Sequence, residues 1–278
     1  MARERITLKT DADIVLMREA GLITAAALNA VREAIAPGVS TLELDAIAEA
    51  TIISMGARSN FKLVPGYNHT ICASVNDEVV HGIPSKDRIL QAGDTISVDC
   101  GAITPSGWNG DSAFTMVVPG GAPEVMAQRQ ALSDVCEASL WAGIAAFAKA
   151  KRLNEVGRAV ENSIRSAGRY GILQDYIGHG VGRSMHEDPA VFNYQTRDLG
   201  PVVQAGMVIA IEPMITSGNQ AVKVLGDDWT VSTKDGSDSS HWEHTVARHS
   251  KGIWVLTAED GGVAGLAKYG IIPVPLES

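Results

Sequence analysis

The chain has few cysteines, and their number and spacing argue against two common architectures. Cys72, Cys100 and Cys136 are an odd number, and no two of them form a Cys-x-x-Cys pair. Disulfide frameworks use even numbers of cysteines in oxidising compartments, and structural zinc sites use paired thiolates. The sequence therefore predicts a reducing, cytoplasmic location without a disulfide framework or a structural zinc ion.

Long apolar runs and an excess of positive charge are also missing. No apolar run reaches the ~18 residues that a membrane-spanning helix needs, and residues 1–13 contain no apolar segment of a signal peptide. The formal net charge is −9, from 23 basic and 32 acidic residues, which argues against general nucleic-acid binding. We therefore expect neither a membrane nor a nucleic acid as a partner.

The composition, with 45% hydrophobic and 20% charged residues, is typical of a globular protein that buries a sizeable core. Apolar residues spaced three and four apart predict helices over 11–35, 41–55, 123–150 and 153–168, with Ser40–Thr41 as an N-cap. Alternating patterns bounded by turn residues predict strands in 61–75, 78–81, 94–118, 207–216, 219–224, 229–233 and 242–256. We expect 207–216 to pair with 219–224 and 229–233 to pair with 242–256, and residues 178–189 to form a glycine-rich loop. We expect residues 1–10 to form a polar arm, 11–257 a single domain and 258–278 a C-terminal tail.

Residues 94–118 predict a β-hairpin that carries two carboxylates in an otherwise apolar pattern. Asp99 lies on the first strand and Asp111 on the second, and the turn residues 105–107 lie between them. A carboxylate in such a hairpin is costly unless something neutralises it. These residues alone leave two alternatives open: a solvated turn acid beside a strand acid paired with Lys or Arg, or a metal site.

A weak internal repeat relates the two halves of the chain. Asp99 follows the tripeptide QAG at 91–93, and Glu212 follows the same tripeptide at 204–206 with the same spacing. A predicted helix that ends in glycine precedes each tripeptide. The repeat predicts two similar α+β halves, about 11–122 and 123–257, whose sheets meet near a pseudo-twofold axis. Such an interface favours a central cleft.

Five ionisable residues lie in apolar or glycine-rich segments: Asp99, Asp111, His179, Glu212 and Glu243. Four acids and one histidine on converging elements cannot all be buried without a compensating positive charge. Two divalent cations would offset them, and mixed oxygen and nitrogen ligands suit Mn, Fe, Co or Zn rather than Ca. Two metal ions ~3.5–4 Å apart would hold a bridging hydroxide and polarise a carbonyl.

Five segments resemble, in order and spacing, the type I methionine aminopeptidases: VVHGIP (79–84), VDCG…NGD (98–111), GHGVGR…HEDP (178–189), AIEPM (210–214) and DDWTV…HWEHT (227–245). The resemblance covers residues 12–256. It implies an α+β pita-bread fold, in which two pseudo-symmetric halves have antiparallel sheets covered by helices, with 11–257 as the catalytic domain. It also implies a dinuclear-metal hydrolase that removes the N-terminal methionine from nascent proteins and peptides when the second residue is small.

The resemblance assigns metal-binding roles residue by residue. Asp99 resembles the bidentate ligand of one metal ion, and Asp111 and Glu243 resemble bridging ligands. His179 and Glu212 resemble the ligands that complete the other ion. A hydroxide that bridges the two ions would attack the first peptide bond, and Glu212 would transfer the proton to the leaving amine.

His81 and His186 resemble the two histidines of the family that are not ligands, and that contact substrate and stabilise the tetrahedral intermediate. His81 precedes Gly82, in a turn from which its side chain could reach a cleft, and His186 follows His179 in a glycine-rich segment. Without the other motifs, His81 could equally be a loop histidine hydrogen-bonded to backbone, and His186 a polar surface residue.

Selectivity for methionine needs a small, apolar and polarizable pocket. By resemblance, the wall of this pocket consists of Phe61, Tyr67, Cys72, Met185 and Trp229. The alternative for each is packing in the hydrophobic core. The sequence departs from the family pattern at the pocket rim, because the family commonly has Phe at the position of Met185 and Tyr-His at the position of Val64–Pro65.

Three alternative functions share this fold. An aminopeptidase P or prolidase has the same ligand set but usually carries a large N-terminal domain, whereas the pattern here starts within the first 15 residues. A creatinase-like hydrolase lacks the full ligand set, and a non-catalytic binding protein typically loses ligands. We expect a monomer whose partners are nascent polypeptide N-termini, with a transient ribosome contact.

Overall fold

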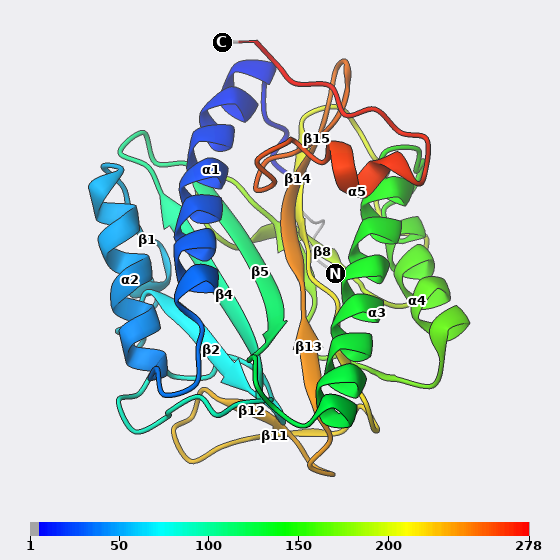
Figure 1. The fold of residues 1–278 in the computed structure, drawn as a ribbon. Coiled ribbons are helices and arrows are strands. Elements are labelled where there is room, and N and C mark those ends of the chain that lie inside the picture. Colours follow the sequence, from blue (N-terminus) through cyan, green and yellow to red (C-terminus); the bar gives the residue numbers. More distant parts are fainter. Residues whose placement is uncertain (1–5, 278) are drawn as a thin grey trace.

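A nine-stranded antiparallel sheet forms the centre of the fold in the computed structural model, which describes residues 6–277 (Figure 1). Its strands are β1 (Arg58–Ser59), β2 (Ile71–Val75), β4 (Thr95–Ile103), β5 (Asn109–Val117), β7 (Gly178–Gly180), β8 (Glu187–Val191), β9 (Met207–Ile211), β14 (Glu243–His249) and β15 (Gly252–Val255). The order across the sheet is β1-β4-β5-β14-β9-β7-β8, while β2 pairs with β4 and β15 pairs with β14. The strands of the first half of the chain therefore lie together on one side of the sheet and those of the second half on the other, and the two sets meet where β5 pairs with β14.

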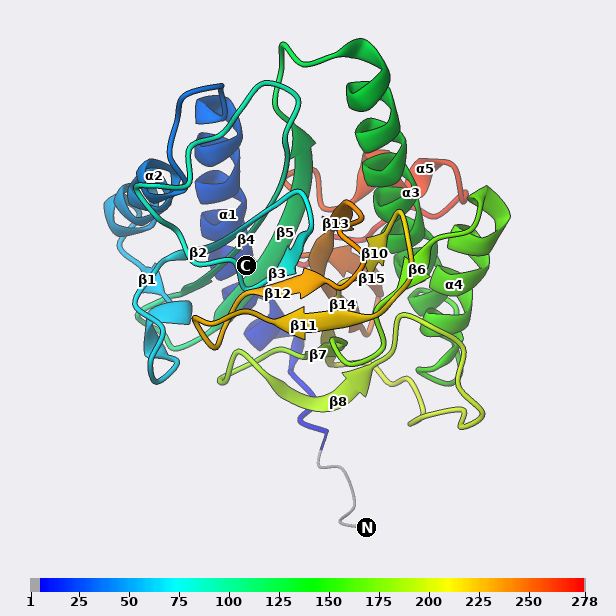
Figure 2. The same cartoon turned by 90° about the horizontal axis from the view of Figure 1, so that it is seen from below.

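Two three-stranded sheets complete the strand structure. One has the order β13-β10-β6, from Ser239–His241, Met214–Thr216 and Gly171–Ile172. The other has the order β11-β12-β3, from Val222–Val224, Val231–Thr233 and Glu78–Val80. Figure 2 shows β11 and β12 on the side of the molecule opposite the long helices.

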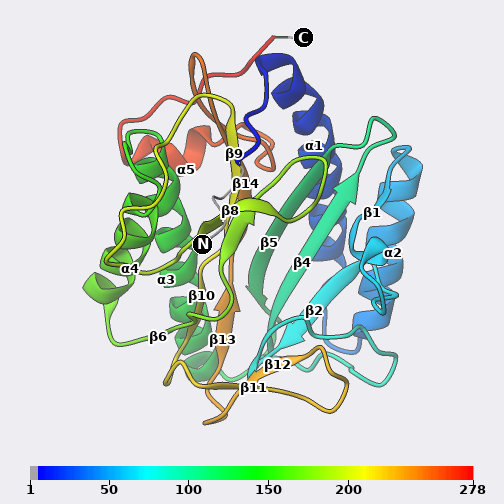
Figure 3. The ribbon, with the colours of Figure 1, turned by 180° about the vertical axis from the view of Figure 1, so that it is seen from behind.

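The long helices form two pairs, one for each half of the chain. They are α1 (Asp11–Ala34), α2 (Thr41–Ser54), α3 (Pro123–Phe147) and α4 (Glu155–Ala167). Two short helical elements lie elsewhere in the chain: α5 (Val263–Ala267) and the 3-10 turn η1 (Phe61–Leu63). Thr10 and Ser40 each form a capping box with the acidic residue three positions on, which fixes the starts of α1 and α2. Figure 3 shows α1 and α2 on one flank of the sheet and α3 and α4 on the other.

Each helix pair buries its own hydrophobic cluster against the sheet. Side chains such as Leu28, Leu44 and Ile96 join α1 and α2 to β4, whereas Leu140 and Ile209 belong to the cluster that joins α3 and α4 to β9. The helices therefore cover one face of the sheet in both halves. This arrangement confirms the predicted α+β class with two related halves.

The helix α1 is long and apolar enough to cross a membrane, with a mean hydropathy of 1.5 over its most apolar window. The prediction that no apolar run reaches that length did not anticipate this. In this fold 56% of that window is buried, as in the core helix of a folded domain. Gly21 lets α1 pack closely against the backbone at Leu256, because a Cβ at this position would lie 2.2 Å from the Leu256 carbonyl oxygen.

Several strand predictions are wrong in their bounds or partners. The predicted strand 61–75 begins with η1, and only Ile71–Val75 is extended. The predicted strand 207–216 is interrupted at Glu212–Pro213, because proline lacks the N–H that a central strand needs. The segment expected to be a glycine-rich loop contains β7 and the start of β8, and β11 pairs with β12 rather than with 207–216. The segment 229–233, which contains β12, does not pair with 242–256. Besides β11, β12 pairs with β3.

The ends of the chain pack on the sheet. Residues 1–5 of the predicted arm lie outside the described residues, but the Lys9 amide donates a hydrogen bond to the Gly206 carbonyl at 2.7 Å. In the predicted tail, Leu266 and Leu276 are buried, and the Val274 amide donates to the Ile253 carbonyl at 2.9 Å. The division of the chain at residues 10, 122 and 257 stays a prediction.

Candidate metal centre

Three of the predicted ligands share one face of the sheet because of the register around Ala113. Asp99 on β4 and Glu243 on β14 both pair with Ala113 on β5. Directly paired residues point to the same face, and so do residues two apart along one strand, such as Asp111 and Ala113. The small Ala113 side chain thus lies between the three carboxylates. Ligand atoms of the three lie within 4.8 Å of one another.

The second half of the chain brings the other two predicted ligands to the same face. His244 pairs with Ile211, so that continuing this register by one residue places Glu212 beside Glu243. His179, between two glycines of β7, is held beside β9 by the pairing of Gly180. Ligand atoms of His179, Glu212 and Glu243 also lie within 4.8 Å of one another. Glu243 therefore belongs to both groups.

The carboxylates are buried without cationic partners. Asp111 is 3% exposed and Glu243 is 2% exposed. Asp99 Oδ1, Asp111 Oδ1 and Glu243 Oε1 are buried oxygens without a hydrogen-bond partner. Across residues 6–277, no lysine or arginine forms an ion pair with Asp99 or Asp111. The alternative of a strand acid paired with Lys or Arg is therefore wrong.

Burial and mutual repulsion dominate the electrostatics of the site. Burial raises the pKa of Asp99 to about 7. Burial, together with repulsion from Asp99 and Glu212, raises the pKa of Asp111 well above its ordinary value. Burial and neighbouring carboxylates also raise the pKa of Glu212 and of Glu243. Oxygen ligands that are unpartnered, buried and mutually repulsive fit divalent cations, whose charge would reverse these shifts.

His179 is oriented as a nitrogen ligand by its own strand. Its Nδ1 lies 2.9 Å from the Gly180 carbonyl oxygen, which makes Nδ1 the protonated nitrogen. Nε2 then carries the lone pair, and it lies 3.4 Å from Glu212 Oε1 and 3.9 Å from Asp111 Oδ2. Burial lowers the pKa of His179 to about 3, so the ring is neutral, as metal ligation requires.

Two residues that sequence reasoning missed hold the backbone of the ligands. Thr245 Oγ1 accepts a hydrogen bond from the Asp111 amide at 3.0 Å and donates one to the Asp111 carbonyl at 2.7 Å. Asn193 Nδ2 donates to the Glu212 carbonyl at 3.0 Å. Thr245 could have been found, because it lies two residues after Glu243 and so shares its face. Asn193 carries no comparable signal.

One cavity of about 160 Å³ joins the carboxylates to an apolar end. All the predicted site residues line it: Phe61, Tyr67, Cys72, His81, Asp99, Asp111, His179, Met185, His186, Glu212, Trp229 and Glu243. Val64 and Val80 line it as well. Val80 was missed although it directly precedes His81, and Val64 is one of the departures noted at the rim.

The apolar end of the cavity carries no charge at neutral pH. The Tyr67 hydroxyl donates to the Ile71 carbonyl at 2.6 Å, and its ring meets Trp229 edge to face at 5.1 Å between centroids. Burial raises the pKa of Tyr67 and of the Cys72 thiol, so both remain protonated. This end of the cavity therefore suits an uncharged, apolar side chain.

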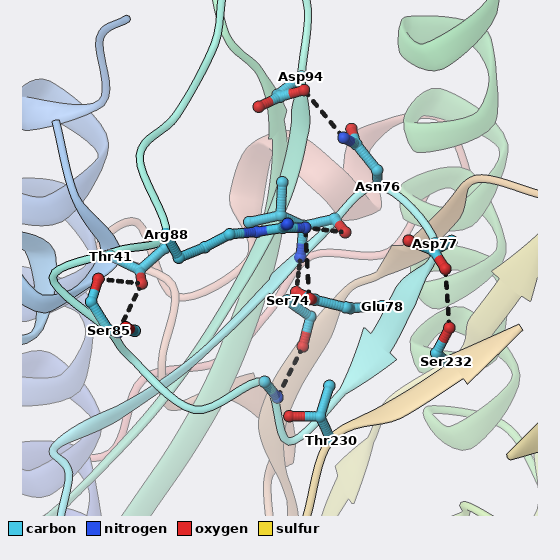
Figure 4. A network of polar contacts seen from close by, with 12 residues as sticks. Thr41, Ser74, Asn76, Asp77, Glu78, Ser85, Arg88, Asp94, Thr230 and Ser232 are labelled. Carbon is cyan, nitrogen blue, oxygen red and sulfur yellow. Dashed lines mark hydrogen bonds and ion pairs between the residues drawn. The ribbon is translucent and has the colours of Figure 1, made fainter. Parts of the chain in front are cut away.

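His81 lies in a strained turn that a polar network supports. Its φ is +59°, which is uncommon for a residue with a Cβ, and Gly82 follows it with its amide donating to Ser74 Oγ at 3.1 Å. Before the turn, Glu78 accepts from the Val75 amide at 2.8 Å and pairs with Arg88 at 3.3 Å, as Figure 4 shows. The network fixes the backbone on both sides of His81.

His186 reaches the metal-binding end of the cavity, and His81 lines the same cavity. The ring of His186 meets that of His179 edge on, at 4.2 Å between centroids. Burial lowers the pKa of His81 to about 4 and also lowers that of His186, so both rings are neutral at pH 7. A neutral imidazole can still donate one hydrogen bond to substrate.

The fold has two related halves, and its cavity combines unpartnered carboxylate oxygens, the imidazole of His179 and an apolar end. This combination defines a metal-dependent enzyme that acts on a substrate with an apolar group. The chain belongs to metallopeptidase family M24, whose model matches residues 15–249. Within that family it is a type I methionine aminopeptidase by resemblance to its relatives, as the sequence motifs predicted. Family membership implies binding of a divalent metal.

Relatives match over nearly the whole chain. Methionine aminopeptidase 1 of Mycobacterium tuberculosis is 46% identical over 92% of this chain and 96% of its own length. Methionine aminopeptidase 1 of Bacillus subtilis is 41% identical over 91% of this chain and 99% of its own length.

Solved structures show the same fold. A methionine aminopeptidase from Rickettsia prowazekii has a TM-score of 0.86 at 31% identity, covering 91% of this chain and 100% of that chain. A prolidase from Pyrococcus furiosus, at 24% identity and a TM-score of 0.66, matches this chain over 90% of its length but only 65% of the prolidase. These matches confirm the predicted pita-bread fold.

The metal-free protein should lose stability as the pH rises from about 7 to about 8.5. The raised folded-state pKa values of the carboxylates mean that the folded state holds protons that the unfolded state has released. The free energy of unfolding then falls as pH rises through the folded pKa of about 7 for Asp99. Denaturant titrations with a chelator at the two pH values measure this change. Excess Mn²⁺ should reverse it, because metal ligands must be deprotonated. Equal stability of the chelated protein at both values would contradict the electrostatics described above.

Proposed function

We propose that the protein removes the N-terminal methionine from nascent proteins and peptides, preferably when the second residue is small. One observation carries the proposal: a single cavity joins an apolar end to the buried carboxylates. An apolar side chain in that end would bring the amine and carbonyl of the same residue toward the metal-binding end. A pocket for one apolar side chain beside the metal-binding end favours an enzyme that acts on the first residue of a chain.

We infer that two divalent ions bind, because Glu243 belongs to two groups of ligand atoms. In this assignment Asp99 holds one ion, His179 and Glu212 hold the other, and Asp111 and Glu243 bridge them. Mn, Fe, Co or Zn suits this set of oxygen and nitrogen donors. When bound, two such ions supply positive charge that acidifies water and polarises a carbonyl.

Glu212 is the proposed proton carrier. Glu212 directly follows β9 and precedes Pro213, where the strand is interrupted. It is 9% exposed and lines the cavity. In this role the carboxylate would accept a proton from the attacking water. The same carboxyl group would deliver that proton to the leaving amine.

His81 and His186 are the proposed donors to the scissile carbonyl oxygen. Both line the cavity, and both are neutral rings that can donate through one nitrogen. Hydrogen bonds held in place before the reaction stabilise negative charge as it develops on that oxygen. The supported turn at His81 keeps its ring in position.

Phe61, Tyr67, Cys72, Met185 and Trp229 form the proposed methionine pocket. Phe61, Tyr67 and Cys72 form a buried cluster against which Met185, Trp229 and Val64 pack. Contacts of sulfur with aromatic rings favour a thioether there.

The proposed partners are nascent polypeptide N-termini. We propose a cytoplasmic monomer that contacts the ribosome transiently. The free, buried cysteines support a reducing location.

A panel of peptides tests the proposed function. With Mn²⁺ or Co²⁺, the protein should cleave Met-Ala-Ser faster than Met-Leu-Ser, and both faster than Ala-Pro-Ser. The apolar end of the cavity should also favour Met over Lys in the first position by at least about tenfold. Release of the first residue is measured by liquid chromatography. Preferential cleavage of Ala-Pro-Ser would favour the prolidase alternative, and no turnover with any metal would contradict the proposal.

The substitution Glu212→Gln should lower kcat by at least about a hundredfold, because the amide cannot carry the proton. Metal content of the variant is measured alongside kcat, which separates loss of the proton carrier from loss of a ligand. Glu124→Gln, at an exposed glutamate in the first turn of α3, serves as the control. Turnover that survives in Glu212→Gln would refute the proton role.

A further inference from the structure

Lys9, in the segment that precedes α1, forms a buried ion pair with Glu187. Its Nζ lies 2.7 Å from Glu187 Oε2, and the two side chains are 2% and 15% exposed. Lysine is rarely so buried unless it is paired. The backbone holds Lys9 in place, because its amide donates to the Gly206 carbonyl at 2.7 Å and its Nζ also donates to the Thr7 carbonyl at 3.0 Å.

The Glu187 carboxylate organises the turn 182–187. Its Oε1 accepts a hydrogen bond from the Ser184 amide at 3.1 Å. A Cβ at Gly182 would lie 2.4 Å from the same oxygen, so glycine here leaves room for the carboxylate in its observed position. The turn carries Met185 and His186, which both line the cavity. The position of these two side chains therefore depends on the carboxylate that follows them.

The opposite side of the turn is tied to the hairpin that carries two proposed metal ligands. Asn109 Nδ2 donates to the Gly182 carbonyl at 2.9 Å and to the Arg183 carbonyl at 3.2 Å. The Arg183 guanidinium stacks 3.9 Å from the centroid of the Trp108 ring and donates to the Ser106 carbonyl. The turn is thus held between the β4–β5 hairpin and Lys9.

We propose that Lys9 is a positioning residue that acts through Glu187 on His186 and Met185. This inference rests on the proposed function, which gives those two residues their contacts with substrate. Removing one partner of a buried ion pair leaves an uncompensated charge. Without Lys9, the Glu187 carboxylate would turn toward water and release the Ser184 amide. A shift of about 1 Å at a substrate-contacting group is enough to slow a reaction substantially.

The substitution Lys9→Met, which keeps the length of the side chain but removes its charge, tests the proposal. We expect kcat/KM for Met-Ala-Ser to fall at least about tenfold, with kcat lowered through His186 and KM raised through Met185. Lys9→Arg should recover much of the activity, because it restores the charge. Lys149→Met removes an exposed charge that takes no part in these contacts and should behave as wild type.

A second background tests whether Lys9 acts through Glu187. In Glu187→Gln, which can still accept from the Ser184 amide, adding Lys9→Met should not lower kcat/KM further, because Lys9 no longer has a carboxylate to hold in place. If the double variant lost kcat/KM by the product of the two single-variant losses, the proposal would be overturned. Wild-type kinetics in Lys9→Met would overturn it as well.

Hydrogen exchange of the metal-free protein gives a readout that does not depend on activity. Amides of 182–187 should exchange faster in Lys9→Met than in wild type, with the melting temperature changed by only a few degrees. Unchanged exchange in this turn would overturn the inference. The proposed function fails separately, if wild type does not cleave Met-Ala-Ser while the turn still responds to Lys9→Met.

Discussion

Repulsion among buried carboxylates is the constraint on which the rest of this structure depends. Asp99, Asp111, Glu212 and Glu243 share one face of a sheet, and three of their oxygens have no hydrogen-bond partner. Such a cluster costs folding free energy unless a cation occupies it. The fold tolerates the cost because helices on the opposite face bury two large hydrophobic clusters. Stability and metal binding are thus coupled through the same side chains.

The geometry of the cluster follows from strand register rather than from flexible loops. Ala113 has a carboxylate partner on each side because β5 lies between β4 and β14. Around this rigid centre, the two histidines proposed to contact substrate lie on turns, and each of these turns has its own polar support. The network of Figure 4 holds the turn at His81, and Lys9 with Glu187 holds the turn at His186. Precise placement of functional turns by a rigid scaffold is typical of enzymes.

Much of the site could be predicted from sequence, because the residues that carry it break local patterns. Asp99 and Glu212 are acids in apolar strands after a repeated tripeptide, and every predicted site residue lines the cavity. Strand partners were less predictable, since β12 pairs with β3 from the other half of the chain, which no local pattern indicates. Support from distant segments was missed for the same reason: Lys9 and Glu187 are 178 residues apart, and neither breaks a local pattern.

Calorimetric titration of Asp111→Ala with Mn²⁺ tests most directly whether the carboxylates form one shared centre. Asp87→Ala, at an exposed aspartate, is the matched control. The account predicts two ions bound per chain in the wild type and in the control, and tight binding of neither ion in Asp111→Ala, because the bridging carboxylate serves both. An Asp111→Ala protein that still binds one ion with wild-type affinity would contradict the shared centre.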